Sequence, residues 1–364
     1  MELLHPPLSE GRFHSLHTPY QVASNPADLS PIDRRLINGR TQQSAMPTLL
    51  VTGGAGFIGG HTARRALDLG WSVRILDNFS TGRKDTGEEL EALGATIISG
   101  DVRSESVVNS AVSGCDAVAH FAAQTSVPRS MEQPEETMEV NVEGTSAIIK
   151  ACQVHGVKRF VMASSAAVYG TKDEFPLREH HAGTFHSPYA DSKWQNEHQV
   201  LLAKDEGMEA VALRFFNVYG AGQRSDGTYA AVIPKFIEMA LAGQAATVFG
   251  DGLQTRDFVH VSDCANAVLM MVTQPWDNER AHVYNVCTET ECSLLDLISE
   301  IHGVLEEIAP EIARRAPNHG PERAGDIARS IGSNANLCHD TEWTPTVEFA
   351  EGLRQQILDA LQGA

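Results

Sequence analysis

Short apolar runs alternate with longer amphipathic stretches along the chain from Thr48 onward. Runs of this kind, apolar on both faces, are typical of buried strands in a parallel sheet. We expect strands at Thr48–Thr52, Ser72–Asp77, Thr96–Ser99, Ala117–Phe121, Arg159–Ala163 and Ala210–Phe215. Helical periodicity covers Gly56–Leu69, Glu105–Val112, Thr137–His155 and Tyr189–Gly207. Strands that alternate with helices predict an α/β fold with a doubly wound parallel sheet.

The pattern changes after about Gly220, where loops rich in Gly and Asp separate shorter elements. We expect a first domain over residues 46–220, to which a segment near 258–288 returns, and a smaller mixed α/β domain over 221–364. The smaller domain should cover the carboxyl edge of the sheet, where ligands bind in open α/β sheets. Residues 1–45 contain several prolines and no clear period, which predicts a mostly disordered extension.

The composition of the chain excludes several classes of binding partner and leaves the predicted fold unchanged. The formal net charge of −19 disfavours nucleic acid, because nucleic-acid binders concentrate Lys and Arg. No apolar run is long enough to span a membrane, and residues 1–45 lack the apolar core of a secretory signal. The six cysteines form no CxxC pair and lack zinc-ligand spacing, so we expect free thiols, no bound metal and a cytoplasmic location.

A glycine-rich turn joins the first expected strand to the first expected helix. Its glycines are Gly53, Gly56 and Gly59. Glycines at this spacing let the backbone approach a pyrophosphate, and the helix N-terminus favours its negative charge. Asp77 ends the second expected strand, where a carboxylate accepts hydrogen bonds from the adenosine ribose and repels a 2′-phosphate. The first domain is therefore predicted to be Rossmann-like and to bind NAD in preference to NADP.

Three residues near this turn leave alternatives open. Arg83 and Lys84 follow Asp77 closely and would instead favour the 2′-phosphate of NADP. Asp101 follows the third expected strand, where its carboxylate either reaches the adenine amine or caps the helix expected at Glu105–Val112.

Tyr189 and Lys193 are four residues apart on one expected helix, so their side chains share a face. A phenol has a pKa of about 10, and a neighbouring ammonium together with a positive nicotinamide ring favours the phenolate. Tyr189 is therefore predicted to be the general base that takes a proton from an alcohol. Ser165 follows the fifth expected strand and is predicted to hydrogen-bond the same oxygen.

Nine segments of the sequence together resemble one family. They are Thr52–Gly59, Leu76–Gly82, His120–Ala123, Asn141–Thr145, Ser164–Gly170, Ser187–Lys193, Arg214–Gly220, Gln254–Val261 and Arg323–Asp326. From about Pro47 to its end the chain is similar to the extended short-chain dehydrogenase/reductases of the NAD-dependent epimerase/dehydratase family, and most to the UDP-glucose and UDP-N-acetylglucosamine 4-epimerases. The resemblance implies an isomerase of nucleotide-sugar and galactose metabolism, with NAD as cofactor, a UDP-sugar as substrate and a homodimeric assembly.

The same resemblance implies which residues bind the two ligands. Those expected to line NAD are Gly53, Gly56, Phe57, Ile58, Gly59, Asp77, Asn78, Asp101, Val102, Phe121, Ala122, Ala123, Asn141, Tyr189 and Lys193. Those expected to hold the UDP-sugar are Ser165, Asn217, Phe249, Arg256, Arg323, Asp326 and Ser330. Two arginines suit a pyrophosphate, and a carboxylate suits a ribose. The alternative for Arg256 and Arg323 is a surface ion pair.

Relatives of this fold differ in the reaction that follows oxidation at C4 of the sugar. The resemblance implies an acidic pair just after the catalytic Ser or Thr in dehydratases, and a Glu there in decarboxylases. This chain has Ala166 and Ala167 instead. A 4-epimerase needs no acid at these positions, so we expect UDP-hexose 4-epimerase activity. The alternatives are a 4,6-dehydratase, a decarboxylase, a 4-reductase, or a protein that binds NAD without catalysis.

Ser330 is expected to set the sugar specificity. Alignment from Asp326 brings Ser330 to the position that, in this family, walls the pocket opposite the C2 substituent of the sugar. Epimerases confined to plain hexoses resemble one another in placing a bulky Tyr there. A serine leaves room for an N-acetyl group and can hydrogen-bond it. The alternative is that Ser330 is an ordinary serine at the end of a loop or strand.

Overall fold

The computed structural model describes residues 46–225, 231–323 and 325–362, so the extension predicted over 1–45 lies outside the described residues. Within that part, seven parallel strands form the main sheet in the order β11-β6-β5-β4-β1-β2-β3. Their bounds are β1 Thr48–Thr52, β2 Ser72–Asp77, β3 Thr96–Ser99, β4 Ala117–His120, β5 Arg159–Ser165, β6 Glu209–Phe215 and β11 Val283–Val286. The order reverses between β1 and β4, which is where doubly wound folds bind ligands. The prediction of a Rossmann-like α/β fold is therefore confirmed.

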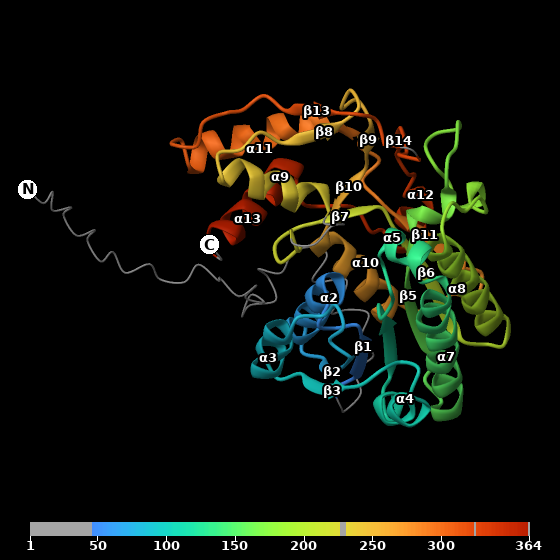
Figure 1. Cartoon of the computed structure of the whole chain (residues 1–364). Coiled ribbons are helices and arrows are strands. Elements are labelled where there is room, and N and C mark those ends of the chain that lie inside the picture. The colour runs from blue at the N-terminus through green and yellow to red at the C-terminus, as the bar shows by residue number, and fades with distance from the viewer. Residues whose placement is uncertain (1–45, 226–230, 324, 363–364) are drawn as a thin grey trace, which may run out of the picture.

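Helices cover both faces of this sheet (Figure 1). One face packs against α2 Phe57–Asp68 and α10 Val261–Thr273, whose apolar side chains share a core with β1 and β2. The other face packs against α4 Glu105–Val112, α7 Gly144–His155 and α8 Pro188–Asp205. The central strands are buried because they are apolar on both faces. None of the helices in the described ranges is long and apolar enough to cross a membrane.

A second core lies beyond one end of the sheet, around three helices (Figure 1). The helices are α9 Val232–Leu241, α11 Leu294–Ile308 and α13 Phe349–Gln362. The short helix α12 Ala335–Thr341 precedes α13 in the chain, and its Leu337 packs in the core of the main sheet. The short strands are β7 Asn217–Tyr219, β8 Thr247–Phe249, β9 Thr255–Arg256, β10 Phe258–His260, β12 Cys292–Ser293, β13 Asn318–Gly320 and β14 Arg329–Ser330. Between β10 and β12 the chain returns to the main sheet through α10 and β11, which pairs with β6.

Three local details differ from the expectation. The sequence does not predict α3 Lys84–Ala92, because this charged segment buries only Gly87 and Leu90 and shows little apolar periodicity. The helix expected at Thr137–His155 begins earlier, as α6 Pro134–Met138, and passes through a π-helical turn at Glu139–Glu143 before α7. Such turns are frequent at functional sites. Short α5 Val127–Glu132 precedes α6, and β5 extends to Ser165, which closes the strand instead of following it.

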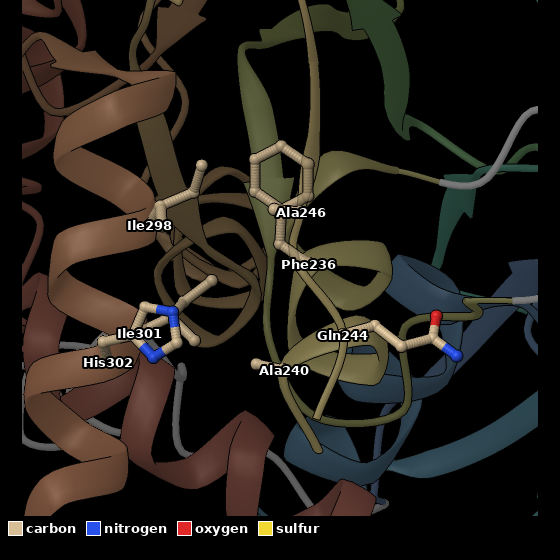
Figure 2. A pocket seen from close by; sticks show the side chains of 7 residues that line it. All are labelled: Phe236, Ala240, Gln244, Ala246, Ile298, Ile301 and His302. Atoms are coloured by element: carbon tan, nitrogen blue, oxygen red, sulfur yellow. The ribbon is translucent and has the colours of Figure 1, made fainter. Parts of the chain in front are cut away.

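A small cavity in the second core lies between α9 and α11 (Figure 2). It is lined by Phe236, Ala240, Gln244, Ala246, Ile298, Ile301 and His302. Its volume of about 10 Å³ leaves room for about one water molecule and is far below that of a ligand pocket. Since none of the predicted site residues lines it, the cavity belongs to the packing of this core and not to the predicted site.

Candidate functional site

The glycine-rich turn between β1 and α2 is too tightly packed to admit side chains. Gly53 has a φ angle of +67°, and a Cβ atom on it would lie 2.7 Å from the backbone nitrogen of Ala122. A Cβ atom on Gly59 would lie 2.3 Å from the carbonyl oxygen of Gly53. α2 begins directly after Gly56, so its first N–H groups point into this turn. Bare backbone next to a helix N-terminus is the arrangement that binds a pyrophosphate.

Asp77 closes β2 and faces the same turn. Its carboxylate accepts hydrogen bonds from the backbone N–H groups of Ala55 at 3.0 Å and Phe79 at 2.8 Å. Burial raises the pKa of Asp77, and these two bonds oppose that effect. Each carboxylate oxygen can accept a further hydrogen bond, which suits a ribose hydroxyl. Arg83, which would favour NADP, instead donates from Nε to Asp85 at 2.9 Å.

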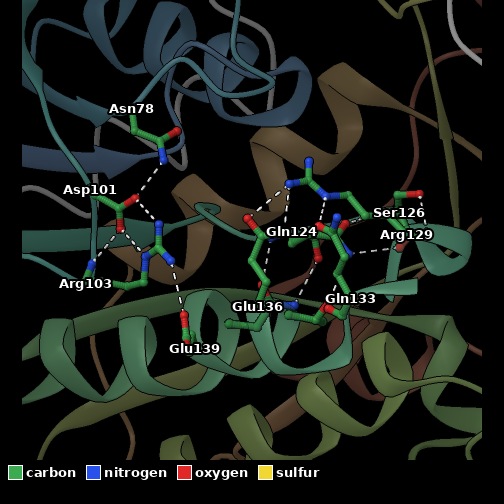
Figure 3. A network of polar contacts seen from close by, with 11 residues as sticks. Asn78, Asp101, Arg103, Gln124, Ser126, Arg129, Gln133, Glu136 and Glu139 are labelled. Carbon is green, nitrogen blue, oxygen red and sulfur yellow. Dashed lines mark hydrogen bonds and ion pairs between the residues drawn. The ribbon is translucent and has the colours of Figure 1, made fainter. Parts of the chain in front are cut away.

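Asp101 lies in a polar network beside this turn (Figure 3). Arg103 donates to its carboxylate from Nε at 2.9 Å and from Nη2 at 2.8 Å, and Asn78 donates from Nδ2 at 3.0 Å. Arg103 holds the pKa of Asp101 well below its usual range. The N-cap of α4 is Ser104, so the alternative role of Asp101 as this cap is wrong. The network instead fixes Asn78 and Asp101 next to one another.

Several other residues expected to line NAD come from the start of α2, from the segment between β3 and α4, and from the loop after β4. Phe57 and Ile58 begin α2, and the Val102 side chain packs against Gly144 at the start of α7. The run Phe121–Ala123 follows β4 directly. Within that run, the backbone N–H of Ala122 donates to Thr52 Oγ1 at 3.2 Å, which holds the loop against β1.

Asn141 lies in the π-helical turn and is almost fully buried. Its side-chain oxygen accepts from the backbone N–H of Gln124 at 2.7 Å, and its amide donates to the Gln124 carbonyl at 3.0 Å. The same amide donates to Ser192 Oγ at 2.9 Å, between Tyr189 and Lys193 on α8. Asn141 therefore ties the loop after β4 to α8 through protein groups alone.

Ser165, Tyr189 and Lys193 meet at the carboxyl end of β5. Tyr189 lies in the first turn of α8, with the Ser165 side chain near its phenol. Ser165 Oγ also accepts from the backbone N–H of Ala167 at 3.2 Å. Lys193 Nζ donates to the carbonyl oxygen of Ala163 at 2.9 Å and lies 6.0 Å from the centre of the Tyr189 ring. The structure thus brings all three predicted catalytic residues together.

Burial has the largest effect on the pKa values of Tyr189 and Lys193. It raises the pKa of Tyr189, against the opposing effect of the Ser165 hydroxyl, and it lowers the pKa of Lys193 to about 8. The sequence argument that Lys193 lowers the Tyr189 pKa is therefore not met by the protein's own groups. Burial, together with the charge on Lys193, also lowers the pKa of His120 to about 3, so His120 is neutral. Its ring nitrogens hydrogen-bond Thr52 at 2.6 Å and Thr145 at 2.9 Å.

The residues expected to hold the substrate come mostly from short strands and loops of the second core. Arg256 on β9 donates from Nη2 to Asp326 at 2.7 Å and from Nη1 to the Ile327 carbonyl at 2.6 Å. The Arg323 guanidinium lies 3.8 Å from the centre of the Phe249 ring. Four expected residues therefore form two pairs, Arg256 with Asp326 and Arg323 with Phe249. Arg256 does make the ion pair that was its alternative reading, but it is largely buried.

Ser330 is buried in β14, which pairs with β9 so that Ser330 lies opposite Arg256. The next residues contact the loop that continues from Ser165. Leu177 donates its N–H to the Ile331 carbonyl at 2.8 Å, and Ser333 donates to the Leu177 carbonyl at 2.9 Å. Ser330 thus sits between the arginine-bearing strand and the loop that follows Ser165.

Sequence and structure comparisons place this site among known proteins. The profile of the NAD dependent epimerase/dehydratase family matches residues 49–287. The chain belongs to this family. It is 34% identical over 315 residues to a putative UDP-glucose 4-epimerase of Methanocaldococcus jannaschii, covering 85% of this chain and 97% of that protein.

Two further proteins that are similar to this chain differ from each other in the reaction that their names state. The chain is 31% identical over 325 residues to a UDP-N-acetyl-alpha-D-glucosaminuronate decarboxylase of Bacillus cytotoxicus, covering 85% of this chain and 96% of that protein. The solved UDP-N-acetylglucosamine 4-epimerase of Methanobrevibacter ruminantium, in complex with UDP-N-acetylmuramic acid, matches with a TM-score of 0.80 at 31% identity. That match covers 88% of this chain and 100% of the other.

The site fits NAD, the cofactor of the epimerase/dehydratase family. The turn at Gly53 and Gly59 leaves no space for a Cβ atom, so a ligand there would contact backbone N–H groups directly. Asp77 at the end of β2 retains acceptor capacity for ribose hydroxyls. The glycines would hold the pyrophosphate and Asp77 the adenosine ribose.

Sequence reasoning missed two elements of this family site. Glu197 and Arg214 form a buried ion pair beside Lys193, and the spacing of Glu197, four residues after Lys193, was the available signal. Asp257, next to Arg256, is fully buried and accepts from the backbone N–H groups of Thr288 at 2.8 Å and Gly332 at 3.3 Å. Burial raises the pKa of Asp257 to about 6.

Proposed function

We propose that this epimerase/dehydratase family member is a UDP-hexose 4-epimerase. Its substrates would be UDP-glucose and UDP-galactose, together with their N-acetylamino counterparts. The observation that carries this proposal is the meeting of Ser165, Tyr189 and Lys193 next to two alanines. The 3₁₀ helix η3, Ala166–Tyr169, begins directly after Ser165, and neither Ala166 nor Ala167 can move a proton. A dehydratase or decarboxylase reaction, which follows oxidation at C4 of the sugar, would therefore find no acid or base at positions 166 and 167.

In the proposed reaction, Ser165, Tyr189 and Lys193 act in the oxidation at C4 and again in the reduction that follows. Tyr189 takes the proton of the C4 hydroxyl as general base, while Ser165 hydrogen-bonds the same oxygen. NAD held by the glycine turn and Asp77 would supply the hydride acceptor, and later the hydride donor, that inversion at C4 requires. Tyr189 then gives its proton back to the C4 oxygen. Lys193 Nζ lies 6.0 Å from the centre of the Tyr189 ring, where its positive charge would favour the phenolate that forms during the reaction.

The UDP moiety would lie between β9 and β8 of the second core. Arg256 and Arg323 would neutralise the pyrophosphate, and Asp326 would accept from a ribose hydroxyl. The contact of Arg256 with Asp326, and of Arg323 with Phe249, orients these side chains before a ligand arrives. Asn217 donates from Nδ2 to the Asp257 carbonyl at 3.1 Å, which anchors it beside the same strands.

Incubation with UDP-glucose and UDP-N-acetylglucosamine separately, with chromatographic resolution of the C4 epimers, tests the proposal. Both substrates should yield the C4 epimer without added cofactor. Tyr189→Phe should retain bound NAD and lose about 10²–10⁴-fold in turnover, because general acid–base groups contribute that much. Near-normal turnover by Tyr189→Phe would contradict the mechanism.

The decarboxylase relative makes UDP-N-acetyl-α-D-glucosaminuronate a necessary further substrate in the same assay. We expect no release of carbon dioxide, since Ala166 and Ala167 supply no acid beside Ser165. Carbon dioxide release without any epimer from the neutral sugars would replace the epimerase proposal with a decarboxylase.

A further inference from the structure

Helix α8 carries a third charged position in line with Tyr189 and Lys193. Glu197 follows Lys193 by four residues, so the three side chains lie along one face of the helix. Its carboxylate accepts from Arg214 Nε at 2.8 Å and from Arg214 Nη2 at 2.7 Å. Glu197 and Arg214 are each only 2% exposed. This is a two-pronged, fully desolvated pair, unlike the ion pairs of a protein surface.

The pair reaches the immediate neighbours of the catalytic residues. Ser164, which precedes Ser165, donates from Oγ to Glu197. Arg214 Nη1 donates to Tyr169 Oη at 2.9 Å, and Tyr169 closes η3, whose N-cap is Ser165. The ion pair therefore joins α8 and β6 to both sides of Ser165 through direct hydrogen bonds.

We propose that Glu197 and Arg214 are positioning residues that fix α8 against the carboxyl end of β5. Through that contact they would hold Tyr189 at Ser165 and Lys193 at the Ala163 carbonyl. The inference rests on the proposed function in one respect, that Tyr189 and Ser165 act together on the C4 hydroxyl. It adds to the proposed function the two residues that set the relative positions of Ser165, Tyr189 and Lys193.

The pair also acts on the charge of Lys193. Burial lowers the pKa of Lys193, and the Glu197 carboxylate opposes this by favouring the ammonium. The other groups that face Lys193 are Tyr189 from its own helix and neutral His120 from β4, while Arg214 of β6 lies on the far side of Glu197. Loss of the Glu197 charge should therefore let Lys193 deprotonate at lower pH.

Three variants separate positioning from simple stability. Glu197→Gln leaves Arg214 buried without its partner, which is strongly destabilising. Glu197→Leu combined with Arg214→Met removes both charges, and such apolar replacements of buried pairs are commonly tolerated. Ser164→Ala removes a single hydrogen bond to Glu197 and keeps the ion pair.

Glu209→Gln is the matched control. It removes the carboxylate of the Arg159–Glu209 pair, which joins β5 to β6 at the ends of these strands that lie away from Ser165. Arg159 donates from Nε to Glu209 at 2.6 Å, so this is also an arginine–carboxylate pair, but it lies farther from Ser165 and is more exposed than the Glu197–Arg214 pair. This variant should react at the wild-type rate.

The readout is single-turnover reduction of the bound NAD by UDP-glucose, followed by the absorbance of the reduced nicotinamide across pH. The double variant should keep its NAD content, its melting temperature and its KM, and should reduce NAD about 10²-fold more slowly, the usual cost of misplacing reacting groups. The alkaline limb of its rate profile should move to lower pH. Ser164→Ala should slow the reduction to a smaller extent and leave the alkaline limb in place, because Glu197 keeps its charge.

A wild-type rate in Ser164→Ala, together with a wild-type rate and pH profile in the double variant, would overturn the inference. So would an equal loss in Glu209→Gln, which would make the effect one of general stability. A wild-type protein that reduces NAD but forms no epimer would refute the proposed function alone, because the reduction step still reports on the positioning pair. A wild-type protein that does not reduce NAD with any UDP-sugar would refute both.

Discussion

Gly59→Ala should remove NAD from the protein while leaving most of the fold in place. A Cβ atom at this position would lie 2.3 Å from the carbonyl oxygen of Gly53, whereas ordinary contacts begin at 3.4 Å. The shortfall of about 1.1 Å falls on backbone atoms, which cannot rotate away as a flexible side chain would. The turn must therefore shift, and the shift moves the N–H groups that would contact the pyrophosphate.

The size of the effect follows from two opposing contributions. Alanine in a helix is favoured over glycine by about 1 kcal/mol, whereas forced overpacking costs about 1–3 kcal/mol. The net loss of stability should be at most about 2 kcal/mol, too little to unfold a protein of this size. Cofactor binding should suffer more, because it depends on backbone positions to within about 0.5 Å.

Gly303→Ala provides the matched comparison, since Gly303 also lies inside a helix, α11, but has nothing within 4 Å of a Cβ atom. Both variants are purified without added cofactor, and NAD released by denaturation is measured against protein concentration, with melting temperature by circular dichroism. Gly303→Ala should retain NAD and gain up to about 1 kcal/mol. Full NAD content in Gly59→Ala would refute the assignment of this turn to the pyrophosphate.

Three other predictions follow from the site. Protein purified without added cofactor should carry NAD and not NADP, because Asp77 closes β2 at the turn and Arg83 is held by Asp85; recovery of mainly NADP by chromatography would contradict this. Ser330→Tyr should exclude UDP-N-acetylglucosamine while sparing UDP-glucose, and an equal response of both substrates in competition assays would show that Ser330 is not the gate. The folded-state pKa of Asp257 is raised from 3.8 to about 6, so stability from its protonated form is present below about pH 4 and lost as the pH rises through 6. Relative to Asp257→Asn, which does not titrate, wild-type stability in urea titrations should fall by about 3 kcal/mol between about pH 4 and pH 7, and a constant difference would contradict the raised pKa.

The main sheet was predictable because its strands are apolar on both faces and each is followed by a clear turn or helix signal. The glycine turn and the pair Tyr189 and Lys193 were predictable because local spacing alone sets their geometry. α3 was not, since its charged sequence buries little and gives no periodic signal. The π-helical turn at Glu139–Glu143 was hidden inside a regular helical pattern, because an extra residue in a turn leaves no compositional mark.

The electrostatics of the site depend on contacts between distant segments, and here the sequence was less informative. A charged residue such as Glu197 in a long helix is normally solvated, and only the fold brings Arg214 of β6 against it. Likewise the balance at Tyr189 turns on how deeply the phenol is buried, which raises its pKa despite the nearby lysine. The spacing of residues along the sequence predicted which groups lie together, but not how deeply they are buried.

The return of the chain to the main sheet has a consequence for how the protein is made. β11 lies at the edge of the sheet beside β6, and α10 covers α2, yet both emerge from the ribosome after most of the substrate strands. A nascent chain that ends at Phe215 would present β6 as an open edge and α2 with an uncovered apolar face, which are templates for aggregation. The cofactor half thus cannot finish folding first. Synthesis must pass through β7, β8, β9 and β10 of the second core before α10 covers α2, so the two parts of the chain fold together.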